Sequence, residues 1–432
     1  MAISSLSDTF VKPALFFSPP CKISSHEFSK RKLATVCASL SCSTGGPVRN
    51  VPLDKHVVRD NSILFVQKLK TLIQNHPQRY VSVQILNKYR SYLALSHKTC
   101  SVHSMILKYP SVFQLVRVRS VANCRSHLCV GLTAAASALV AREYDLHCSD
   151  SVNMASKLQK LLMLSSHRRL LLSKLIHLAP DLGLPQNFAS ILCNHFPTKF
   201  KIIDASFGKA IELVEFDSNS VISLPFPDES SYGLIVDRQL KFNQPRLRKG
   251  FYVKRKHQEF LIRFRQQHEV CPYRTPASEL PKHSVESEKR ACHVVREVLG
   301  MTIGKRTLID YLAIFRKEFG LPNRLRAMIL RHPDMFYVSC KGLRNSVFLL
   351  ECFDDEGKLV IKDEALSIQE QLIQLIGKSK NTKQSAVRIN GPLPYFDGLD
   401  NVIQSEDSCL NPFDDGDKLN ICSIQSDLRE SW

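Results

Sequence analysis

Basic and aromatic residues alternate along residues 241–265, a combination suited to nucleic acid. Basic side chains attract phosphates, and aromatic rings stack on unpaired bases. Glu259 is the single acid in this stretch. We therefore expect its basic residues to contact RNA: Lys241, Arg246, Arg248, Lys249, Lys254, Arg255, Lys256, Arg263 and Arg265.

The rings of this stretch divide into two pairs. Phe251 and Tyr252 are the predicted stacking residues. Phe260 and Phe264 share one face if the chain is helical there, because residues one turn apart lie side by side. That spacing favours rings that face the protein and leaves the basic residues in solvent.

A second basic set lies on a helix predicted over residues 323–332. It consists of Arg324, Arg326 and Arg331, and the first and last of these share a helix face. The set predicts contact with phosphate; a solvated helix face is the alternative.

The charge of the whole chain points to the same kind of partner. The formal net charge is +19, and it is unevenly spread. Residues 1–50 carry +4 and residues 393–432 carry −7, which leaves +22 on residues 51–392. A basic body of this size favours a polyanion, most simply a nucleic acid.

Catalytic and metal-binding patterns are missing from the sequence. It has no Gly-x-x-x-x-Gly-Lys loop, no His-Glu-x-x-His and no Gly-x-Ser-x-Gly. We therefore expect no catalytic residue, no cofactor and no small-molecule substrate. One cluster of potential ligands fits no zinc spacing, so no metal is expected there either: Cys124, His127, Cys129, His147 and Cys148. No run reaches the roughly 18 apolar residues that span a bilayer, so no membrane partner is expected.

A repeated pattern provides the elements that must position these residues. Pro-x-x-Phe-x-aliphatic occurs three times, at Pro110, Pro197 and Pro333. Each copy follows a helix-like stretch and begins a strand-like one. The proline ends the helix, and the phenylalanine is predicted to anchor the first strand in the core. Gly-Leu-Pro precedes the last two copies, where the glycine allows a left-handed turn out of a helix.

The periodicity predicts three helices and a two-stranded hairpin around each copy. The expected helices are 61–77, 82–93 and 101–108, then 152–164, 170–178 and 186–196, and finally 286–299, 307–319 and 323–332. The expected strands are 112–116 and 127–132, then 200–203 and 210–216, and finally 335–339 and 346–350.

This order predicts an α+β, mostly α, fold of three tandem winged-helix-like modules, whose last helix is placed to contact nucleic acid. An irregular α-rich fold with small hairpins is the alternative. The predicted modules are 61–150, 151–240 and 285–378, with a linker at 45–60 and the basic connector at 241–284.

Both ends of the chain have distinct compositions. Residues 1–44 are rich in serine, poor in acids and interrupted by proline, which is typical of an organellar transit peptide. This favours the chloroplast stroma, with the mitochondrion as the alternative. Residues 379–432 are predicted to be a disordered acidic tail.

Several segments, taken in their order along the chain, resemble the plant organelle RNA recognition (PORR) domain proteins. The segments include Ile106 to Phe113, Asp181 to Pro185, Pro272 to Pro276 and Phe319 to Pro322. They continue through His332 to Ser339, Val347 to Glu351 and Asp355 to Val360, and the resemblance covers roughly residues 51–378.

The resemblance implies a protein that enters chloroplasts or mitochondria, binds group II intron RNA and promotes its splicing without catalysing it. The implied partners are organellar intron-containing RNA and other splicing factors in a ribonucleoprotein complex. The alternative function is a helical-repeat organellar regulator of transcription or termination that binds DNA or RNA.

Overall fold

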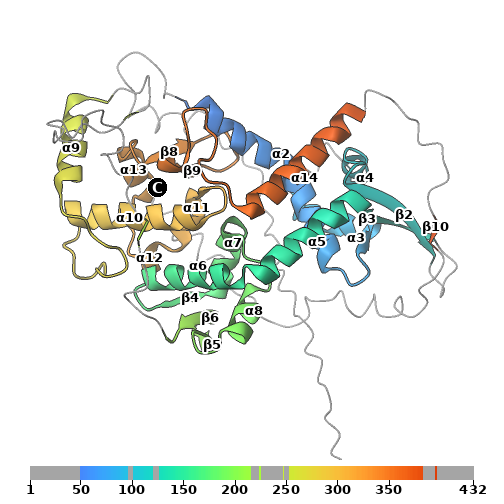
Figure 1. Ribbon diagram of the computed structural model, residues 1–432, viewed down its shortest axis with the longest axis horizontal. Helices are drawn as coiled ribbons and strands as arrows, with labels where there is room; N and C mark the ends of the chain where they lie inside the picture. The colour runs from blue at the N-terminus through green and yellow to red at the C-terminus, as the bar shows by residue number, and fades with distance from the viewer. Residues whose placement is uncertain are drawn as a thin grey trace, which may run out of the picture. The chain divides into compact units, whose positions relative to one another are not determined.

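Figure 1 shows the computed structural model, which describes residues 49–95, 101–119, 126–215, 223–224, 247, 253–382 and 395–396. The chain forms two compact units. Among the described residues, the smaller unit contains 65–133, 378–382 and 395–396, and the larger contains 49–64 and 134–377. The fold is mixed α+β, with small sheets in both units.

One order of elements occurs three times: a helix, a short strand, further helices and a β-hairpin. Repeat one comprises α2 (Val51–Asn75), β1 (Tyr80–Ser82), α3 (Val83–Lys88), α4 (Val102–Ile106), β2 (Phe113–Arg119) and β3 (Ser126–Leu132). Repeat two comprises α6 (Ser151–Leu164), β4 (Arg169–Leu171), α7 (Leu172–Leu182), α8 (Phe188–His195), β5 (Phe200–Ala205) and β6 (Gly208–Leu213). Repeat three comprises α10 (Val285–Met301), β7 (Arg306–Leu308), α11 (Ile309–Ile314), α12 (Arg316–Phe319), α13 (Leu325–Arg331), β8 (Phe336–Ser339) and β9 (Ser346–Leu349).

The three strands of each repeat pair in one shared order. Their strand orders are β1-β3-β2, β4-β6-β5 and β7-β9-β8, and all these pairs are antiparallel. The first strand of each hairpin begins at the phenylalanine of the Pro-x-x-Phe pattern, and that residue faces a leucine on the partner strand every time. Phe113, Phe200 and Phe336 are only 2–3% exposed, which confirms their predicted anchoring role.

The short strands β1, β4 and β7 were not predicted. Each adds a third strand to a hairpin that was expected to have only two. Each lies at the start of an expected second helix. A basic residue with a left-handed backbone precedes it: Arg79 (φ 60°), Arg168 (φ 54°) or Lys305 (φ 48°). The left-handed residue delays the helix, and the next three residues pair with the last strand of the repeat. Such short pairing leaves no periodicity for sequence analysis to detect.

Several helix boundaries follow the predicted punctuation, but the second helix of repeat one, expected over 82–93, ends at Lys88. Gly183 (φ 77°) and Gly320 (φ 65°) end α7 and α12 in the left-handed conformation, as expected from the Gly-Leu-Pro pattern. The expected helix over 307–319 is divided, because Phe315 lies between α11 and α12 outside helical geometry. The first helix begins at Val51 and not at residue 61.

Helices α5 (Ala134–Ser149) and α14 (Glu364–Thr382) lie beyond the predicted elements. The transit segment predicted over 1–44 lies outside the described residues, as does most of the tail. Within the tail, residues 379–382 continue α14, and β10 (Tyr395–Phe396) pairs in parallel with β2. The edge of β2 offers free backbone groups for this pairing.

Repeats two and three share one continuous hydrophobic core in the larger unit. Asp181 of α7 joins them: its carbonyl accepts a hydrogen bond from the Ile303 amide (2.8 Å), and its carboxylate accepts one from the Thr307 hydroxyl (2.6 Å). Burial raises the pKa of Asp181 to about 6, although the bond from Thr307 opposes this shift. No helix in the described ranges is both long and apolar enough to cross a membrane.

Candidate nucleic-acid interface

Helix α9 (Arg255–Gln266) carries most of the predicted RNA-binding residues that the structure describes. Leu261 and Phe264 are buried on one face, while Phe260 is half-buried. Four cations are exposed at the start of the helix and along its other face: Lys254, Arg255, Lys256 and Arg263. The helix is thus amphipathic, with an aromatic inner face and a strongly basic outer face.

The inner face of α9 packs against the end of α13. The Phe264 ring lies 4.2 Å from the ring of His332, centroid to centroid, and the Phe260 ring lies 5.8 Å from it. His257 donates a hydrogen bond from Nε2 to the carbonyl of Arg331 (2.7 Å). The end of α13 therefore lies beside α9, which brings Arg331 close to the basic residues of that helix.

An ion pair at this junction gives Arg265 a different place from its neighbours. Its guanidinium lies 3.4 Å from the carboxylate of Asp334, which is almost fully buried. The two residues hold the end of α9 against the start of β8. Arg265 therefore helps to position α9, whereas the side chains of Arg255 and Arg263 are 92% and 80% exposed to solvent.

The arginines of α13 also differ from one another. Arg324 is exposed at the N-cap, and Arg326 is half-buried. Arg331 lies 2.9 Å from Glu288, which also accepts a hydrogen bond from the buried His332 (2.9 Å). Burial alone would raise the pKa of Glu288, but the bonds from His332 and Arg331 outweigh it and hold that pKa below its ordinary value. Glu288 therefore compensates part of the positive charge of Arg331.

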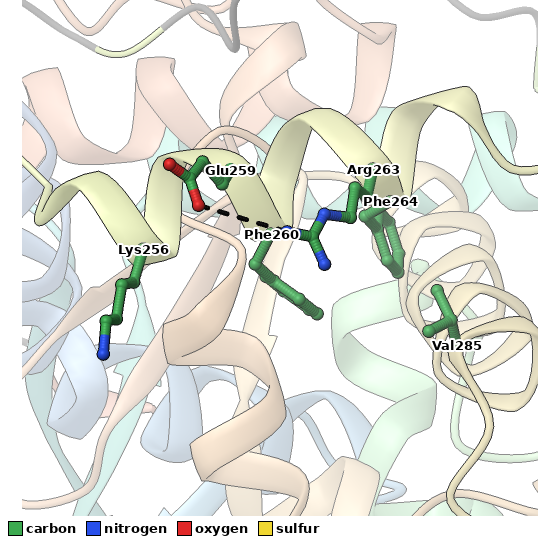
Figure 2. A pocket seen from close by; sticks show the side chains of 6 residues that line it. All are labelled: Lys256, Glu259, Phe260, Arg263, Phe264 and Val285. Carbon is green, nitrogen blue, oxygen red and sulfur yellow. Dashed lines mark ion pairs between the residues drawn. The ribbon is translucent and has the colours of Figure 1, made fainter.

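A pocket of about 390 Å³ opens beside α9. It is lined by Lys256, Glu259, Phe260, Arg263 and Phe264 of α9, together with Val285 of α10. Figure 2 shows the side chains of Lys256 and Phe260 projecting from the same side of the helix. The acid of α9, Glu259, pairs with Arg255 (3.1 Å) and more loosely with Arg263 (4.0 Å).

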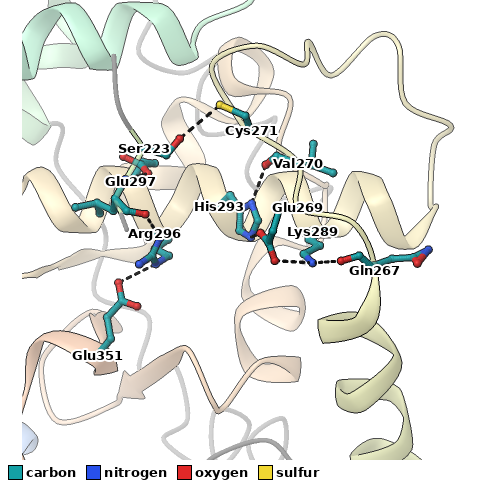
Figure 3. A network of polar contacts seen from close by, with 11 residues as sticks. Ser223, Gln267, Glu269, Val270, Cys271, Lys289, His293, Arg296, Glu297 and Glu351 are labelled. Carbon is teal, nitrogen blue, oxygen red and sulfur yellow. Dashed lines mark hydrogen bonds and ion pairs between the residues drawn. The ribbon is translucent and has the colours of Figure 1, made fainter. Parts of the chain in front are cut away.

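The buried helix α10 supports this surface through charged side chains (Figure 3). Lys289 donates to the carbonyl of Gln267 (2.5 Å) and pairs with Glu269 (2.9 Å), just after α9 ends. His293 donates from Nδ1 to the carbonyl of Val270 (2.8 Å). Burial lowers the pKa of His293, although this bond and Glu269 oppose the shift. These contacts fix where the chain leaves α9.

Further along α10, two neighbouring residues hold a short piece of backbone. Arg296 donates to the carbonyl of Leu224 (2.8 Å) and pairs with Glu351 (2.8 Å). Glu297 accepts hydrogen bonds from the Leu224 amide (2.7 Å) and the Tyr273 hydroxyl (2.9 Å). Sequence analysis missed this supporting network. The one available signal was the placement of charges on every side of the helix, including the side of its apolar residues.

Several predicted residues lie outside the described part of the chain: Lys241, Arg246, Arg248, Lys249, Phe251 and Tyr252. Cys124 of the cysteine and histidine cluster also lies outside it. Within the described ranges, no group of three or more His, Cys, Asp or Glu side chains is placed to hold a metal ion.

Comparison with known proteins agrees with the character of this surface. The family described as the plant organelle RNA recognition domain matches residues 48–381. "Protein WHAT'S THIS FACTOR 1, chloroplastic" of Zea mays is 35% identical over 379 residues, which cover 86% of this chain and 74% of the relative. "Protein ROOT PRIMORDIUM DEFECTIVE 1" of Arabidopsis thaliana is 26% identical, with 86% and 95% covered.

A more distant relative, "Protein WHAT'S THIS FACTOR 9, mitochondrial" of Arabidopsis thaliana, is 23% identical, with 76% of this chain and 82% of the relative covered. No solved structure matches the chain. The relatives above 30% identity are all named chloroplastic, which supports a chloroplast location for this protein. Since the family match extends over most of the sequence, this chain belongs to the plant organelle RNA recognition domain family, an RNA-binding family of plant organelles.

Proposed function

We propose that this protein binds group II intron RNA in the chloroplast and promotes its splicing without catalysing it. The observation that carries the proposal is the surface formed by α9 and α13. There, Lys254, Arg255, Lys256 and Arg263 are exposed beside the end of α13, which carries Arg331. A dense cationic surface of this kind binds the phosphate backbone, and the family match supplies the class of nucleic acid.

We further propose that each repeat is a winged-helix module. The shared order of elements and the shared strand order of the three sheets support this assignment. The proposed modules are 61–150, 151–240 and 285–378, with 241–284 as the basic connector. In the third module, α13 takes the position of the recognition helix.

The proposed role in splicing is to stabilise the folded intron. Group II introns contain their own active site, so a protein need only hold phosphates and unpaired segments in the productive arrangement. Other splicing factors would bind the same ribonucleoprotein. The predicted contacts of Lys241, Arg246, Arg248, Lys249, Phe251 and Tyr252 remain part of this proposal.

Immunoprecipitation of the tagged full chain from chloroplast stroma, followed by sequencing of the bound RNA, tests the proposal. We expect enrichment of one or a few intron-containing transcripts, and loss of their splicing when the protein is depleted. Enrichment of intron-free transcripts alone would reject the splicing role. Preferential retention of duplex DNA by the purified protein would instead favour a regulator of transcription.

A further inference from the structure

The pocket beside α9 combines three kinds of side chain in one place. Phe260 and Phe264 are aromatic, Lys256 and Arg263 are cationic, and Glu259 is a carboxylate. We propose that this pocket holds one unpaired guanine of a bound RNA and that Glu259 selects it. The proposal rests on the proposed function, since it names the part of the RNA that this surface recognises.

The ring of Phe260 is held ready for stacking. It is half-buried, so part of its surface remains open to the pocket. Phe264 and His332, both buried, lie behind it at centroid distances of 6.0 and 5.8 Å. Because its neighbours restrict its movement, little side-chain freedom is lost when a base stacks on it. Aromatic stacking of this kind is a common way to hold an unpaired base.

The two cations are placed on either side of that ring. Lys256 is one helical turn before Phe260, and Arg263 is one turn after it, so both cations lie next to the ring, at the border between the inner and outer faces of α9. The two basic residues are separated by roughly 10 Å along the helix axis. They can therefore hold the phosphates on the two sides of a single inserted nucleotide.

The carboxylate of Glu259 gives the pocket a preference among bases. Guanine presents two adjacent donors, N1–H and N2–H, which match the two oxygens of a carboxylate. In adenine, cytosine and uracil, each donor on the pairing edge has an acceptor beside it, which a carboxylate repels. The ion pairs of Glu259 with Arg255 and Arg263 are exposed and therefore weak, so they keep the carboxylate at the pocket without preventing it from binding a base.

The test measures binding of the purified full chain to short labelled oligouridines by fluorescence anisotropy. One oligomer contains uridine only, and the others contain a single central guanine, adenine or cytosine. We expect the wild-type protein to prefer the guanine oligomer by about tenfold. Glu259→Gln should lose this preference, and its affinity for plain oligouridine should rise because a negative charge leaves the surface.

Phe260→Leu should weaken binding of the guanine oligomer by about tenfold. Phe207→Leu is the matched control, because Phe207 is 76% exposed in the turn between β5 and β6 and lies outside the pocket. The control should bind as the wild type does. Thermal unfolding of each variant checks the fold, and Glu259→Gln alters only a surface group, so it keeps the test decisive if Phe260→Leu is unstable.

Two failures have different meanings. If the wild-type protein binds every oligomer equally, or if Glu259→Gln keeps the guanine preference, the pocket is not a guanine site and the proposed function stands. If the wild-type protein binds neither the oligomers nor intron RNA, the proposed function fails and the pocket proposal fails with it.

Discussion

Neutralising three exposed cations of α9 should reduce the salt dependence of RNA binding. The variant replaces Lys254, Lys256 and Arg263 together with glutamine. Each side chain is exposed, so the change leaves the buried face of α9 intact. Each phosphate contact to single-stranded RNA contributes about 0.7 to the slope of log affinity against log salt, so three lost contacts reduce that slope by about 2. Between 50 and 200 mM salt, this corresponds to roughly a 20-fold smaller loss of affinity.

Filter binding or anisotropy at several salt concentrations, with one intron RNA, measures the slope. The matched control replaces Lys199, Lys201 and Lys209 with glutamine. These lysines are exposed on and beside the hairpin of repeat two, so the control loses the same amount of charge. The control should keep the wild-type slope. Equal slopes for the α9 variant and the wild type would refute the assignment of this surface, and an equal change in both variants would show that only net charge matters.

Three further predictions concern stability, each measured by denaturant or thermal unfolding of the full chain. The pKa of Asp181 in the fold, about 6, exceeds its ordinary 3.8. The stabilisation that Asp181 contributes is therefore complete below pH 3.8 and is lost as pH rises through 6. Asp181→Asn keeps the acceptor for Thr307 and should stabilise the protein above pH 6 by an amount on the order of 3 kcal/mol; no gain there relative to acid pH would contradict this. Gly320→Ala should destabilise the protein by about 1–3 kcal/mol, because φ is positive there and an added Cβ would lie 2.3 Å from a neighbouring alanine side chain. The control Gly377→Ala lies in a helix with open space around it and should stabilise the protein by about 0.5–1 kcal/mol. Tyr273→Phe removes a hydrogen bond to a buried carboxylate of α10 and should cost about 1–3 kcal/mol; an unchanged midpoint would show that this acceptor finds another partner.

The repeat pattern was a reliable guide to the fold, for local reasons. Proline and glycine restrict the backbone at their own positions, so they mark helix ends without reference to the rest of the chain. Gly183 and Gly320 end their helices as expected. The short strands were missed because a three-residue strand is defined by its distant partner: Tyr80, for example, pairs with Gly131.

The sequence by itself determined the three repeats, the basic stretch and the resemblance to an RNA-binding family, because composition and spacing are properties of the chain. Only the tertiary structure decided how each residue of the stretch is used. Arg265 turns to a buried partner while Arg263 stays in solvent, and Phe264 is buried while Phe260 stays partly exposed in the pocket that both rings line. These outcomes depend on α13, which lies far along the chain but packs beside α9. Exposure and pairing are set by such long-range neighbours, so periodicity within one segment cannot define them.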